Sequence, residues 1–174
     1  MKQRTRVISI FLHVLLLMVV YVFQGMILPY MRLYGFVPLL LPIAATGVAV
    51  CEGRDTGGIF GLFAGILCDV SFGEPAGVFT VLLTITGLII GTLADTIITR
   101  RFATFLIFSA AVLAVSAFVQ MFHLLFFAGV LLQPLISTAI RQSVYSILFA
   151  FPLWFFVKAL GIRAQRLSRS GRLL

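Results

Sequence analysis

Asp69 is the residue whose type and position point most directly to chemistry. It lies in the apolar run Ile59–Phe72, and a charged side chain at the centre of a membrane-spanning helix costs about 2.5–3.5 kcal/mol. Such a carboxylate usually faces the protein interior or a water-filled recess, where it contacts a ligand, an ion or a partner. The alternative is a position near the outer end of the run, where the cost is smaller and Glu74 follows. The sequence leaves both interpretations open.

Glycines recur on the helix face that carries this aspartate. Successive positions at four-residue spacing share nearly one face of a helix, and they are Gly57, Gly61, Gly65, Asp69 and Gly73. A related series in the next apolar run consists of Gly87, Gly91 and Asp95. Faces without side chains let transmembrane helices approach closely. The pattern predicts close packing, either between two helices of this chain or against another protein.

The remaining polar residues do not form a catalytic set. His13 and His123 are single histidines in apolar runs, and Cys51 and Cys68 lack the close spacing of a zinc site. The sequence contains no glycine-flanked nucleophile, no H-E-x-x-H motif and no phosphate-binding loop. It therefore predicts a protein that is not an enzyme and that holds neither a metal ion nor another cofactor.

Composition determines the elements that must position these residues. Of the 174 residues, 61% are hydrophobic and 10% are charged, whereas soluble proteins contain about 45–50% apolar and about 25% charged residues. So large an apolar excess requires lipid as the solvent. A spanning helix needs roughly 20 apolar residues. We therefore expect an all-α polytopic membrane protein, with six transmembrane helices in one compact domain over residues 1–174.

Apolar runs and turn residues give approximate bounds for the six spans. The expected ranges are 7–28, 36–51, 57–72, 77–93, 102–127 and 143–160. The second is short and contains Pro38 and Pro42, so a kink or a small tilt is expected there. Residues 128–142 are interpreted as a loop or a partly embedded turn, and residues 161–174 as a short basic tail.

The basic residues predict the orientation. If the amino terminus is cytoplasmic, eleven of the thirteen lie on the cytoplasmic side: Lys2, Arg4, Arg6, Arg54, Arg100, Arg101, Lys158, Arg163, Arg166, Arg169 and Arg172. Only Arg32 and Arg141 lie outside, as expected from the excess of Lys and Arg in cytoplasmic loops. The net charge of +8 is thus explained by topology without nucleic acid, and both termini are expected to be cytoplasmic.

The tail repeats arginine at every third position, in Arg163, Arg166, Arg169 and Arg172. These side chains are candidates for binding anionic lipid headgroups, with about 1 kcal/mol for each basic residue near the surface. The simpler interpretation is a stop-transfer signal, and the spacing is compatible with both.

The run GGIFGLFAGILCDVSFGEPAGVFT, residues 57–80, resembles the glycine-rich helix, aspartate and following Gly-x-x-x-Gly of the rod shape-determining protein MreD family. Chain size, a first span that ends in a Leu-Pro turn, and a basic tail resemble the family over most of the chain. The positions that match its motif are Gly61, Gly65, Asp69, Gly73 and Gly77. One position departs from it, because many members have an aspartate after the proline that opens the second span, whereas Leu39 follows Pro38 here.

The resemblance implies a non-enzymatic, multi-pass protein of the bacterial cytoplasmic membrane that acts in cell elongation and peptidoglycan synthesis. The partners it implies are an MreC-like protein, the actin-like MreB, RodA and a class B penicillin-binding protein. The alternative is the substrate-binding S subunit of an energy-coupling-factor vitamin transporter, which has a similar size. Those subunits commonly carry an Ala-x-x-x-Ala docking face in the first span, whereas residues 7–28 contain no alanine.

Overall fold

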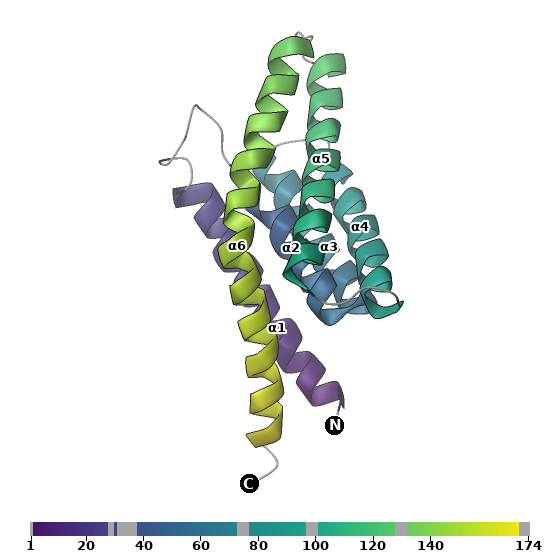
Figure 1. Ribbon diagram of the computed structural model, residues 1–174, viewed down its shortest axis with the longest axis vertical. Coiled ribbons are helices and arrows are strands. Elements are labelled where there is room, and N and C mark those ends of the chain that lie inside the picture. The colour runs from purple at the N-terminus through teal and green to yellow at the C-terminus, as the bar shows by residue number, and fades with distance from the viewer. Residues whose placement is uncertain are drawn as a thin grey trace.

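The computed structural model describes residues 2–27, 30, 38–72, 77–96, 101–127 and 132–170, which are almost entirely helical and contain no strand. The expected all-α fold class is therefore confirmed. In chain order the helices are α1 (Lys2–Val22), the π-helical turn η1 (Phe23–Ile27), α2 (Leu40–Glu52), α3 (Arg54–Phe72), α4 (Val78–Thr96), α5 (Phe102–Phe127) and α6 (Leu132–Ser170) (Figure 1).

Four helical segments in the described part of the chain are long and apolar enough to cross a membrane. They are Ser9–Met26, Val78–Thr96, Phe102–Gln120 and Ile140–Arg163. The expected spans 36–51 and 57–72 correspond to α2 and α3, which are not among the four. With 13 residues, α2 is about 20 Å long at about 1.5 Å per residue, less than the roughly 30 Å of a hydrocarbon core. As a correction to the second expected span, α2 is too short to cross alone.

The interpretation of residues 128–142 as a loop is wrong for most of that segment, because α6 begins at Leu132. Pro134 lies in the first turn of α6, where a missing backbone N–H breaks no helical hydrogen bond. At its other end α6 continues to Ser170 through most of the expected tail, since no glycine or proline interrupts residues 162–170. With 39 residues, α6 is the longest helix of the described chain.

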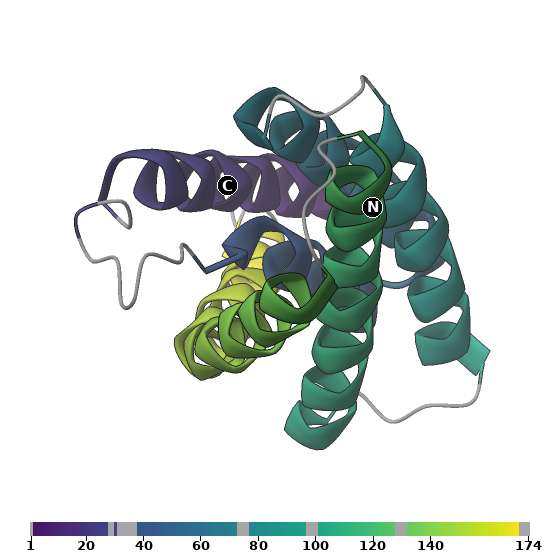
Figure 2. The ribbon, with the colours of Figure 1, turned by 90° about the horizontal axis from the view of Figure 1, so that it is seen from above.

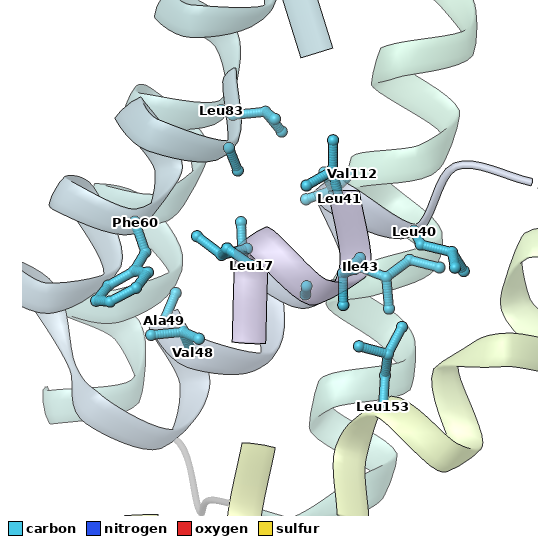
Figure 3. Packing of buried hydrophobic residues seen from close by; sticks show 14 of the residues in the cluster. Leu17, Leu40, Leu41, Ile43, Val48, Ala49, Phe60, Leu83, Val112 and Leu153 are labelled. Atoms are coloured by element: carbon cyan, nitrogen blue, oxygen red, sulfur yellow. The ribbon is translucent and has the colours of Figure 1, made fainter. Parts of the chain in front are cut away.

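Helix α2 lies at the centre of the bundle and contacts α1, α3, α4, α5 and α6 (Figure 2). All its residues from Leu40 to Val50 are buried. Figure 3 shows that Leu41, Ile43 and Val48 of α2 lie among buried side chains of the surrounding helices. The core is therefore built around a short helix that is apolar on every side.

Side chains from neighbouring helices satisfy the buried N-terminus of α2. The backbone N–H groups of Leu40 and Leu41 donate to Gln24 Oε1 at 2.9 and 3.1 Å. The N–H of Leu39 donates to Ser146 Oγ at 2.9 Å. The first N–H groups of a helix have no partner within the helix. The Leu39 side chain cannot accept their hydrogen bonds, so η1 and α6 supply the acceptors.

The start of α1 and the end of α6 lie at the same end of the molecule (Figure 1). This basic end is marked by contacts between Ser9 and Glu52 and between Arg54 and Asp95. The described basic residues in the segments at this end are Lys2, Arg4, Arg6, Arg54, Arg101, Lys158, Arg163, Arg166 and Arg169. Arg141 lies toward the opposite end, near the residues that cap α2.

Candidate functional site

The two glycine series face each other in the antiparallel hairpin of α3 and α4, which share the largest contact of any two described helices. A Cβ atom at Gly61 would overlap the carbonyl group of Leu83, and one at Gly65 would overlap the backbone of Thr80. The two backbones are thus in contact, and only glycine fits at these two positions of α3.

The glycines of α4 are equally constrained. A Cβ atom at Gly87 would overlap the carbonyl oxygen of Gly57, and one at Gly91 would lie 2.6 Å from the Cα atom of Arg54. A Cβ atom at Gly57 would also lie 2.7 Å from the Cβ of Ala49, so α2 packs closely against this hairpin. The glycine faces are therefore covered by helices of the same chain.

Asp69, in the last two turns of α3, caps the N-terminus of α4. Its carboxylate accepts hydrogen bonds from the backbone N–H groups of Gly77, Phe79 and Thr80 at 3.1, 2.9 and 3.1 Å. The hydroxyl group of Thr80 donates to the same carboxylate at 2.6 Å. Carboxylates at helix N-termini satisfy orphan donors and interact favourably with the helix dipole. The charge that is costly in an apolar run is thus matched by four donors.

Asp95 performs the corresponding role at the other end of the hairpin. From the last turn of α4, its Oδ2 atom accepts a hydrogen bond from the N–H of Arg54, the first residue of α3, at 2.9 Å. Each helix of the hairpin therefore carries, near its C-terminus, the aspartate that caps the N-terminus of the other.

Glycines at the starts of both helices allow these caps. Gly53 precedes α3 with φ of 92°, and Gly77 precedes α4 with φ of 104°, a conformation that L side chains rarely adopt. A Cβ atom at Gly53 would overlap the Asp95 carboxylate. A glycine has no side chain with which to cap its own helix, so the acceptor must come from the opposite helix.

An internal repeat underlies this arrangement. Residues 61–69 read GLFAGILCD and residues 87–95 read GLIIGTLAD, so both follow the pattern G-L-x-x-G-x-L-x-D. The contact of Gly65 with Thr80 has its counterpart in that of Gly91 with Arg54. The sequence interpretation grouped Asp95 with its glycines but missed its capping role. Aligning the two runs pairs Asp95 with Asp69 and so marks the two aspartates as equivalent positions.

The other predicted site residues are placed as follows. Gly73 and Arg172 lie outside the described residues, as do the side chains of Arg166, Arg169 and His123. Arg163 is exposed on α6. His13 is fully buried, its Nδ1 lies 2.8 Å from the Ser9 carbonyl oxygen, and its ring edge packs against Phe60. Among the described residues, no group of three or more His, Cys, Asp or Glu side chains could hold a metal ion.

The family model described as rod shape-determining protein MreD matches residues 2–162. No curated protein and no solved structure matches the chain.

We predict that Gly65→Ala lowers the free energy of unfolding by about 1–3 kcal/mol, the usual effect of overpacking a tight contact. The matched control is Gly25→Ala, because nothing lies within 4 Å of a Cβ atom at Gly25. Thermal unfolding of both variants in the same detergent measures the difference. Equal midpoints for Gly65→Ala and Gly25→Ala would show that α3 and α4 are not in backbone contact.

We predict that Asp69→Leu destabilises the fold more than Asp69→Asn, because the amide keeps one acceptor oxygen whereas leucine keeps none. Each unsatisfied buried donor costs about 1–3 kcal/mol. The control is Ser71→Ala, which removes an exposed hydroxyl group from the same end of α3. The capping role of Asp69 would be refuted by an unfolding midpoint for Asp69→Leu equal to that of Ser71→Ala.

Proposed function

Because the chain belongs to the rod shape-determining protein MreD family, we propose that it is a non-enzymatic component of the cell-elongation and peptidoglycan-synthesis machinery of the bacterial cytoplasmic membrane. The observation that carries the proposal is the family match over residues 2–162. It agrees with a helical chain that has four segments suited to membrane crossing. No feature of the fold or of the comparison favours the alternative of a vitamin-transporter S subunit.

In this proposal the chain acts as a rigid membrane scaffold. The glycines and the two aspartates pack and cap the helices of the hairpin, and so hold α3 and α4 in place. In this proposal the partners therefore contact other surfaces. One such surface is the outer face of α3, where Ile59, Phe63, Ile66 and Val70 are exposed. The proposed partners are an MreC-like protein, the actin-like MreB, RodA and a class B penicillin-binding protein.

The proposed orientation places the basic end in the cytoplasm. Lys and Arg accumulate in cytoplasmic segments, and the segments at one end of the described structure carry almost all its basic residues. Arg163 and the following arginines of α6 then lie beside the inner leaflet, where they would bind anionic headgroups.

We predict that a phosphatase fused after Leu174 is inactive and that a green fluorescent protein fused at the same position is fluorescent, because both termini are cytoplasmic. A phosphatase inserted after Tyr34 is the positive control, since η1 and the start of α2, which flank this position in the sequence, lie at the opposite end. Active phosphatase at Leu174 would overturn the orientation.

We predict that the chain, purified with an affinity tag from a rod-shaped bacterium in a mild detergent, brings an MreC-like protein with it. Gly65→Leu should lower this recovery because it separates α3 from α4, whereas Gly25→Ala, where nothing lies within 4 Å of the added Cβ atom, should leave it unchanged. Membrane abundance of each variant is measured alongside. Recovery of paired ATPases in place of an MreC-like protein would contradict the proposed function.

A further inference from the structure

A cavity of about 140 Å³ lies at the basic end, between the C-terminus of α2 and the second half of α6. Its lining includes Glu52 from α2 and Trp154, Lys158 and Gly161 from α6. The hairpin site does not use this cavity. An acidic and a basic side chain therefore share one small space beside an aromatic ring.

Glu52 gives one side of the cavity negative charge. The side chain is half-buried, and its Oε1 atom accepts a hydrogen bond from the Ser9 hydroxyl group at 3.0 Å. Among the described side chains it has no ion-pair partner. The carbonyl groups at the C-terminus of α2 add partial negative charge. Gly161 leaves space for the carboxylate, because a Cβ atom there would lie 3.3 Å from Oε1.

Lys158 gives the other side positive charge. Its Nζ atom lies 5.9 Å from the centroid of the Trp154 ring, which stacks on Phe105. Lys158 lies five residues before the end of the apolar segment Ile140–Arg163, and Trp154 lies one helical turn deeper. A lysine close to the end of a spanning segment can extend its flexible side chain to the lipid headgroups. This position suits a cavity that receives a headgroup from the basic end.

We propose that this cavity binds the headgroup of a phospholipid that carries a primary ammonium group, a phosphatidylethanolamine. The ammonium group pairs with Glu52 and the phosphate group pairs with Lys158. A purely anionic headgroup would leave the Glu52 carboxylate unpaired and repelled, and a cation alone would leave Lys158 without a partner. This inference concerns a lipid ligand and does not depend on the proposed function.

Trp154 makes the proposal directly measurable, because it is the only tryptophan of the chain and it lines the cavity. The protein is reconstituted into vesicles that contain equal mole fractions of brominated phosphatidylethanolamine, phosphatidylglycerol or phosphatidylcholine in an unbrominated background. Bromine quenches tryptophan fluorescence only near contact. We expect phosphatidylethanolamine to quench Trp154 most strongly.

Two variants and a control test the two charges. Glu52→Gln should lower the relative affinity for phosphatidylethanolamine about fivefold, the effect of losing one ion pair near the membrane surface. Lys158→Gln should lower it by a similar factor. Asp55→Asn removes an exposed carboxylate at the same end and should preserve the preference. Circular dichroism and unfolding midpoints verify the fold of each variant.

Equal quenching by the three lipids, or a preference for phosphatidylglycerol, would overturn the proposal. So would a phosphatidylethanolamine preference that survives in folded Glu52→Gln. If a variant does not fold, the comparison of the three headgroups with the wild-type chain still decides the outcome.

Discussion

The structure depends on satisfying the backbone N–H groups at helix N-termini, which have no partner within their own helix. Glycines at positions 53 and 77 start α3 and α4 without a capping side chain of their own. Asp69 and Asp95 supply the missing acceptors from the opposite helix. The hairpin is therefore closed at both ends, and closure at both ends holds the glycine faces in register along their length.

The same constraint explains the central helix. The N-terminus of α2 is buried, and Gln24 of η1 and Ser146 of α6 cap it. Ala49 of α2 packs against Gly57 of the hairpin. The caps that hold the N-terminus of α2 therefore also help to position α3 and α4. Helix ends in this chain are thus joined by side chains that come from other helices.

Apolar run length and glycine spacing were sufficient to predict the helical class, the positions of α4 and α5 and the candidate packing residues. They failed for α2, because apolar composition does not distinguish a short buried helix from a spanning one. The same sequence features also predicted a loop at residues 132–142, where α6 begins. Pro134 lies in the first turn of this helix, and a proline at such a position resembles a loop signal. The acceptor role of Asp69 depends on donors eight to eleven residues later, beyond the reach of helical periodicity. The repeat shared by residues 61–69 and 87–95 pairs the two aspartates but does not contain the donors of either cap.

Amide hydrogen exchange at the first turns of α3 and α4 tests the reciprocal capping most directly. First-turn amides exchange rapidly unless an external acceptor protects them. Asp69→Asn should accelerate exchange at Phe79 and Thr80 and leave Arg54 unchanged, whereas Asp95→Asn should accelerate exchange at Arg54 and leave the first turn of α4 unchanged. Rapid exchange of all three amides in the wild-type chain, or the same exchange pattern in both variants, would contradict reciprocal capping.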